Sequence, residues 1–167
     1  MRAKHLLESA LLIAAIASGC SSSDNGPPVD IAMVTWTDNG VRHSVRSPHA
    51  AVVENPSQGP ESRTFFILPI IDGQATVDLE VHTAHGFSTG DYHCGAGSDT
   101  ADVKYGLAGE RTPPSLQDCL VTVYRIGVDH GGIVFYTEGA FAGSIVIGTE
   151  QHDITDGTFS APTTGAR

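Results

Sequence analysis

The chain has 167 residues, of which 40% are hydrophobic and 17% are charged, and this is enough for one domain with a hydrophobic core. Its formal net charge of −10 disfavours nucleic acid and anionic surfaces as partners, because like charges repel each other. We therefore expect an acidic single-domain protein that does not bind nucleic acid.

The first 19 residues predict an export signal. Two basic residues, Arg2 and Lys4, precede an uninterrupted apolar run over residues 10–17. Such a run is too short for a membrane-spanning helix, which needs about 20 apolar residues. A basic start followed by a short apolar core is typical of a signal peptide that is removed from the mature protein.

The residues Ser18-Gly19-Cys20 at the end of this run resemble the lipobox of bacterial lipoproteins. The resemblance implies cleavage before Cys20, a diacylglycerol on its sulfur and usually a further acyl chain (palmitate or similar) on its amine. Such chains anchor a protein to a membrane without a protein span. Ser21 indicates the outer membrane under the sorting rule of enteric bacteria. The lipobox prefers Leu where this chain has Ala17, so an ordinary secretory signal with a nearby free cysteine stays open.

Residues 20–29 are polar and contain Pro27 and Pro28, which predicts a flexible tether. A folded domain is expected over residues 30–161, followed by a C-terminal tail over 162–167. Asp38-Asn39-Gly40 predicts a hairpin turn, because Asn and Gly tolerate the positive φ of a tight turn. The predicted strands are Ile31–Trp36, Val41–Ser47, Ala50–Glu54, Arg63–Ile70, Ala75–His82, Gly90–Cys94, Ala101–Gly106, Asp118–Ile126, Ile133–Thr137, Gly139–Ile147 and His152–Ala161.

Two of these strands alternate between apolar and polar residues. Val77, Leu79 and Val81 share one face of the first. In the second, Val121 and Val123 oppose a face formed by Leu120, Thr122, Tyr124 and Ile126. Many short strands separated by turn signals predict an all-β antiparallel sandwich, with a small β-barrel as the alternative.

Cys94 and Cys119 remain after Cys20 is assigned to lipid. An even pair in an exported protein predicts a disulfide, here joining the sheet edges. The chain-entropy model gives about 3.5 kcal/mol of stabilisation for a loop of this length. Their spacing is not that of a redox-active Cys-x-x-Cys motif.

A second resemblance covers residues 30–161. It is carried by Gly90-Asp91-Tyr92, by Val-Thr-Val at 121–123, by Gly139-Ala140-Phe141-Ala142-Gly143 and by Ile154-Thr155-Asp156-Gly157-Thr158-Phe159. This order is similar to small bacterial lipoproteins that carry a β-sandwich domain of unknown function. The resemblance implies a fold and a location, and it carries no activity.

Phe141 and Phe159 each follow a glycine by two residues, so each Phe and its glycine share a strand face. A glycine on that face leaves room for a large ring from a neighbouring strand. Burying a Phe contributes about 1.5–3 kcal/mol, so core packing is favoured over ligand stacking.

His82, His85 and His93 form the densest histidine cluster and are the candidates for a metal site. A solvated strand face and loop explain them as well, and we expect no metal and no cofactor. Neither a Gly-x-Ser-x-Gly elbow nor a phosphate-binding loop is present, so no catalytic set is assigned.

The sequence predicts a lipid-anchored envelope protein that is not an enzyme. Its β-domain would be a binding or structural module, with an envelope protein or a glycan as partner. Loops of such domains carry ligands, and the candidates are Asn55–Ser62, Gly95–Thr100 and Gly109–Ser115. A metal-binding or hydrolytic protein that uses the histidine cluster is the alternative.

Overall fold

The computed structural model describes residues 33–46, 48–54, 59–107, 110, 112–128, 130–131 and 133–165. The predicted signal peptide 1–19, the lipidation site Cys20 and the tether 20–29 lie outside these ranges. The strands are β1 (Met33–Asp38), β2 (Val41–Arg46), β3 (Ala50–Glu54), β4 (Arg63–Ile71), β5 (Ala75–Thr83), β6 (Gly90–His93), β7 (Thr100–Leu107), β8 (Gln117–Val128), β9 (Val134–Ile147) and β10 (Glu150–Gly165). The part of the chain so described contains no helix, which confirms the all-β prediction.

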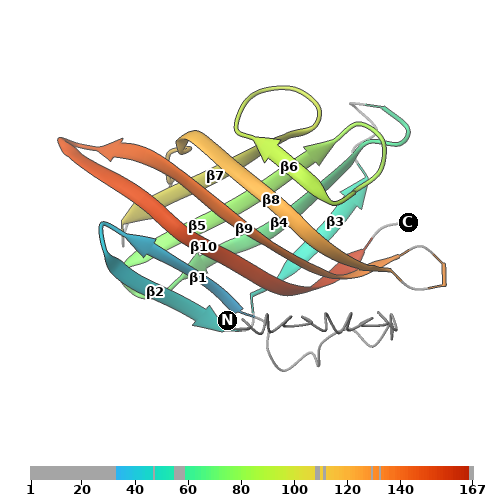
Figure 1. Ribbon diagram of the computed structural model, residues 1–167, viewed down its shortest axis with the longest axis horizontal. Helices are drawn as coiled ribbons and strands as arrows, with labels where there is room; N and C mark the ends of the chain where they lie inside the picture. Colours follow the sequence, from blue (N-terminus) through green and yellow to red (C-terminus); the bar gives the residue numbers. More distant parts are fainter. Residues whose placement is uncertain are drawn as a thin grey trace, which may run out of the picture.

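The strands form one curved sheet in the order β6-β8-β9-β10-β3-β4-β5-β7 (Figure 1). Its two ends meet at a seam, where β7 contacts the chain around Cys94 and Leu116. Backbone N–H groups close the seam: that of Leu116 donates to the carbonyl of Val103 at 2.6 Å, and that of Tyr105 donates to Pro114 at 3.0 Å. The sheet is therefore nearly closed and barrel-like, which corresponds to the small-barrel alternative rather than to the preferred sandwich. Closure pairs the edge strands that an open sheet would expose.

The β1–β2 hairpin, residues 33–46, branches from this barrel. β1 pairs with β10 on one side and with β2 on the other, and the predicted turn at Asn39-Gly40 joins the two strands. Asn39 and Gly40 both have positive φ, which confirms the reason for the turn prediction. The hairpin lies beside the middle of β10, where β1 pairs with residues 154–160 (Figure 1).

The last strand is longer than the sequence pattern indicated. β10 continues to Gly165, and its final residues Thr163–Gly165 pair in parallel with β3. Residues 162–165 thus belong to the sheet, so the predicted tail begins too early. Likewise, the two strands predicted over 133–147 are one continuous strand, β9, because Glu138 between them continues the ladder with β8 and β10.

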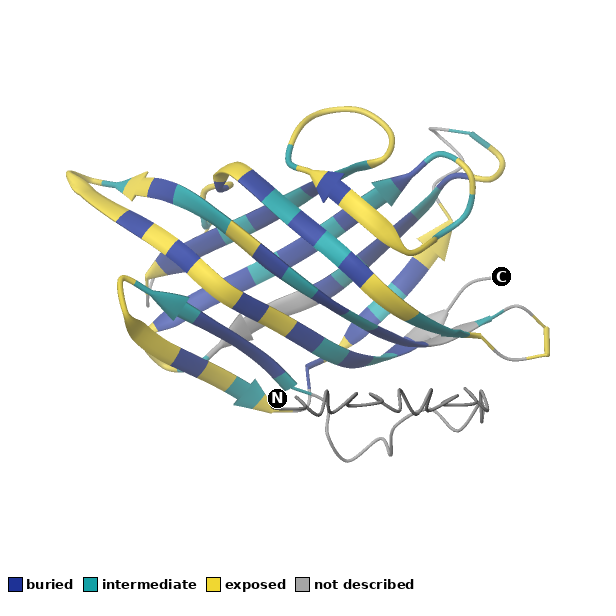
Figure 2. Cartoon of the chain, viewed as in Figure 1, coloured by how far each residue is buried: buried dark blue, intermediate teal, exposed yellow. Residues whose placement is uncertain are grey.

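The interior of the barrel is filled by alternate residues of each strand, and β8, β9 and β10 show bands of buried and exposed positions (Figure 2). Val77, Leu79 and Val81 are fully buried, as their alternation predicted. The predicted pairing of glycine with phenylalanine is confirmed across β9 and β10. Gly139 lies opposite Phe159 and Gly157 opposite Phe141, and a Cβ on either glycine would overlap the facing ring.

The strand ladders contain several register shifts, and three β-bulges among them bear on the sites described below. In β8, Val123 pairs with Gly139 and Arg125 with Glu138, so Tyr124 between them has no partner on β9. Beyond this bulge Ile126 packs against the core, whereas strict alternation had placed it on the same face as Tyr124. The other two bulges contain Asp118 in β8 and Asp156 in β10, and both residues have positive φ.

Candidate functional site

The predicted disulfide joins Cys94, which follows β6, to Cys119 of β8. The Cα atoms are 5.0 Å apart, and the N–H of Cys94 donates to the carbonyl of Cys119 at 2.9 Å. Cys94 also bridges to Ala101 of β7. The disulfide therefore holds edge strand β6 on β8 at the point where the seam closes.

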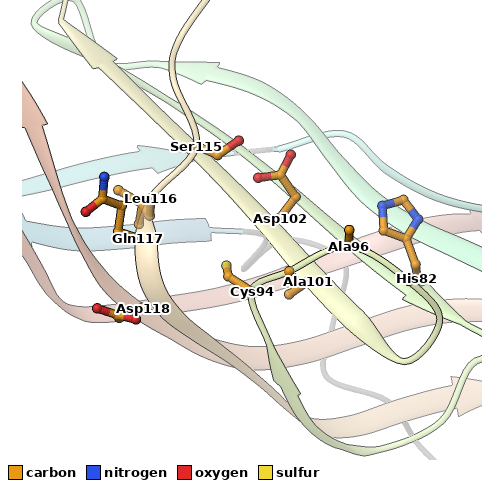
Figure 3. A pocket seen from close by; sticks show the side chains of 11 residues that line it. His82, Cys94, Ala96, Ala101, Asp102, Ser115, Leu116, Gln117 and Asp118 are labelled. Atoms are coloured by element: carbon orange, nitrogen blue, oxygen red, sulfur yellow. The ribbon is translucent and has the colours of Figure 1, made fainter.

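A pocket of about 480 Å³ opens beside this disulfide (Figure 3). Two of the loops predicted to carry a ligand meet there, since Gly95–Gly97 and Ser115 both contribute to its wall. The other residues that line the pocket are His82, Cys94, Ala101, Asp102, Leu116, Gln117 and Asp118. We call this hollow the seam pocket. The third predicted loop, Asn55–Ser62, is described only from residue 59 onward, and its described residues 59–62 do not line the pocket.

Two carboxylates, those of Asp102 and Asp118, line the seam pocket. Asp102 lies on β7, while Asp118 and Gln117 lie at the opposite end of the pocket from His82 (Figure 3). Asp118 reaches this position through a bulge with a φ of 48°, a conformation that Asp tolerates better than most residues. Carboxylate, amide and hydroxyl groups together favour small polar ligands that donate hydrogen bonds, such as amines and hydroxyl compounds.

The outer face of β5 and β7 beside the pocket carries a network centred on Lys104. Its Nζ lies 3.3 Å from Glu80, 3.5 Å from Asp102 and 3.7 Å from Asp78. Burial opposes the charge on Lys104, but the three carboxylates outweigh it and raise the pKa of the ammonium group. Burial is also the main cause that raises the pKa of Asp78. Asp102 is thus oriented by an ammonium group that it shares with two other carboxylates.

The predicted histidine cluster does not converge. His82 Nδ1 lies 3.1 Å from Thr64 Oγ1, and its Nε2 lies 3.5 Å from Glu80. His85 is 85% exposed at its side chain and pairs with Glu61 at 3.5 Å, while His93 is an exposed residue of β6. Across the ranges that the structure covers, no three His, Cys, Asp or Glu side chains meet as metal ligands would. Only His82 belongs to the seam pocket.

The structure also reveals buried polar contacts that no sequence motif predicted. Asp38, at the end of β1, accepts hydrogen bonds from Tyr105 Oη at 2.6 Å and from His152 Nδ1 at 2.9 Å. His43 of β2 hydrogen-bonds through Nδ1 to Asp72, in the turn between β4 and β5. All three pairs join the β1–β2 hairpin to other parts of the barrel, and their members lie far apart in sequence.

Aromatic rings complete this buried network. Trp36 is fully buried and stacks on His43 with ring centroids 5.0 Å apart. Burial and the hydrogen bond to Asp38 raise the pKa of Tyr105, so its hydroxyl stays protonated and continues to donate. With His43 and His152 both at least nine-tenths buried, the network is closed to substrates, and its geometry fits fastening of the hairpin rather than catalysis.

No family model, no curated protein and no solved structure matches this chain. The described ranges also contain no helix that is long and apolar enough to span a bilayer.

Proposed function

We propose that this protein is a lipid-anchored protein of the bacterial cell envelope, with a barrel that acts as a non-catalytic binding module. The anchor is supported by the basic, then apolar leader and by the small residues Ser18 and Gly19 before Cys20. Ser21 favours the outer membrane as the location. The resemblance to small bacterial lipoproteins supports the same proposal.

The seam pocket carries the binding role. It is a hollow whose walls come from three strands and two loops, and the disulfide and the backbone bonds of the seam hold those walls together. A preformed wall loses little conformational freedom when a ligand binds. The ligand class we propose is a small molecule, or a terminal group of an envelope partner, that presents amine or hydroxyl donors to Asp102 and Asp118.

Replacement of Cys20 tests the anchor. We expect Cys20→Ser to abolish labelling of the protein by a radioactive or alkyne-tagged palmitate and to move it from the membrane fraction to the soluble fraction. Cys94→Ser is the matched control, because it changes another cysteine and should leave labelling intact. Membrane retention of Cys20→Ser at the wild-type level would contradict the proposal.

Photocrosslinking in intact cells tests the binding role against a purely structural one. A photoreactive amino acid at Ala96, on the pocket wall, should give a discrete adduct, whereas the same residue at exposed Val146 should not. Ser115→Trp fills the pocket and should remove the adduct without lowering the melting temperature. An Ala96 adduct that persists in the Ser115→Trp protein would exclude the seam pocket as the binding site.

A further inference from the structure

A second hollowed surface lies on the outer face of β8, β9 and β10, and it centres on Tyr124. The side chain is 61% exposed although it stands in the middle of a regular sheet. Two adjoining hollows, of about 440 and 390 Å³, flank the ring, and both are lined by Tyr124 and Thr158. We call them together the Tyr124 groove.

The groove exists because its floor is built from small residues. Ala140 and Ala142 of β9 and Gly157 of β10 line the smaller hollow, while Gly139 lines the larger one. The Cβ positions of the two glycines are directed at the Phe rings of the core rather than into the groove. The small side chains of Ala140 and Ala142 therefore leave this part of the outer face hollow.

The bulge in β8 determines the orientation of the Tyr124 side chain. Tyr124 is the extra residue between two ladder pairs, and bulges are known to turn a side chain out of the regular pattern. The bulge in β10 does the same for Asp156, which has a φ of 50° and lines the smaller hollow. A non-glycine residue in this region costs about 1 kcal/mol, and such strain tends to gather at binding sites. Two bulges thus direct an aromatic ring and a carboxylate into one groove.

A carboxylate stands on each side of the ring. Asp156 lines one hollow and Glu138 the other. Glu138 accepts a hydrogen bond from Tyr136 Oη, and Tyr136 Oη lies 2.7 Å from Ser160 Oγ. Burial, followed by this contact with Glu138, raises the pKa of Tyr136 to about 12. The Tyr136 hydroxyl therefore remains a donor at neutral pH, and the groove offers fixed acceptors and hydroxyls around one exposed ring.

From this arrangement we propose that the Tyr124 groove binds a neutral oligosaccharide chain. The apolar C–H face of a pyranose ring matches the flat face of Tyr124, and its hydroxyl edge matches Glu138, Asp156 and the neighbouring hydroxyls. An added peptide strand is disfavoured, because β9 is already paired with β8 and β10 along both edges. Anionic lipid headgroups are disfavoured by the two carboxylates. This site is separate from the seam pocket and does not depend on lipidation.

Calorimetric titration of the full chain carrying Cys20→Ser tests the proposal without the lipid. Cellotetraose and chitotetraose are the probes, and we expect at least one of them to bind with a dissociation constant below about 1 mM. Tyr124→Ala should weaken that binding about tenfold or more, whereas Tyr124→Phe keeps the ring and should stay within about threefold. Val146→Ala removes a comparably exposed side chain of β9 outside the groove and should have no effect.

A second variant fills the groove without touching the ring. Ala142 is exposed on the groove floor, so Ala142→Leu should block the sugar while leaving the melting temperature unchanged. Failure of both sugars to bind at about 10 mM would overturn the proposal, as would unchanged affinity in Tyr124→Ala. Binding of phosphatidylcholine vesicles that is lost in Tyr124→Ala would assign the groove to a membrane surface and would equally overturn it. None of these results bears on the Cys20 anchor or on the seam pocket.

Discussion

Gly157 shows how closely single positions of this barrel are constrained. Its Cα faces the ring of Phe141 across the β9–β10 ladder, and the neighbouring Asp156 takes up the extra length of the bulge. A methyl group at Gly157 would overlap both the Phe141 ring and its backbone carbonyl. Neither obstacle is the flexible end of a side chain, so relief requires movement of the strand itself.

We expect Gly157→Ala to lower the free energy of unfolding by about 1–3 kcal/mol, because overpacking forces strained side chains and backbone shifts. Urea denaturation followed by tryptophan fluorescence measures this directly. Gly95→Ala is the matched control, since nothing lies within 4 Å of a Cβ built there, and it should change stability little. Equal stability of the two variants would show that β10 moves away from Phe141 at little cost.

At the scale of elements, the β1–β2 hairpin is fastened to the barrel by more than its ladder with β10. Asn39 in its turn donates to the carbonyl of Gln151 at 2.8 Å and accepts from the N–H of Asp153 at 3.0 Å. Asp38 and His43 extend the connection to β7, to β10 and to the turn between β4 and β5. The hairpin thus depends on hydrogen bonds between side chains of distant segments.

The lowered pKa of Asp72 makes the stability of the fold depend on pH. Burial opposes its ionisation, but hydrogen bonds from His43 and from the N–H groups of Gln74 and Ala75 outweigh burial and lower the pKa of Asp72 below 3.8. A carboxylate with a lowered pKa in the folded state stabilises the fold above pH 3.8, and the contribution is lost as the pH falls through the folded-state pKa.

Asp72→Asn should therefore destabilise the protein at pH 7, by about 1.5–3 kcal/mol for a lost hydrogen bond to a charged group. The difference from wild type should shrink as the pH falls below 3.8. Melting temperatures from pH 2 to 7 test this, and hydrogen exchange should show the greatest loss of protection in β2. Asp153→Asn, at an exposed position on β10, is a control that retains the His43 contact. A pH-independent difference would assign the effect to packing rather than to charge.

At the scale of the whole molecule, the disulfide contributes to the stability of the closed barrel. Cys94 and Cys119 are 25 residues apart in sequence, for which the chain-entropy model gives about 3.5 kcal/mol. The double variant Cys94→Ser/Cys119→Ser should lose about this much in guanidinium denaturation, and the chain near the seam should become more sensitive to proteases. Cys20→Ser, which leaves the Cys94–Cys119 pair intact, should have the wild-type midpoint. An unchanged midpoint in the double variant would mean that the backbone bonds of the seam suffice for closure.

Patterns of neighbouring residues predicted much of this fold. The features that they did not predict depend on contacts between segments far apart in the sequence. The alternation at Val77 and Val81 placed their side chains inside, and Asn39-Gly40 placed a turn, because both depend on neighbouring residues alone. Alternation cannot distinguish a barrel from a sandwich, since both bury one face of every strand. The bulge at Tyr124 depends on which residues of β9 lie opposite, so the strand pattern gave no sign of it.

The same limit applies to the candidate sites. Two of the three predicted loops do line the seam pocket, but their meeting depends on closure of the sheet. The histidines were grouped because they are close in sequence, yet His82 and His85 face different carboxylates. Conversely, Asp38 and His152 are 114 residues apart and became neighbours only through the pairing of β1 with β10.

The pairing of β1 with β10 also has a consequence for the order in which the chain can fold. β1 and β3 both complete their ladders on β10, which follows every other described strand in the sequence. These ladders therefore cannot form before β10 is present, because they join segments that lie far apart in the sequence. A stop codon placed before Glu150 should yield a product that proteases clear, even though most of the barrel is encoded upstream.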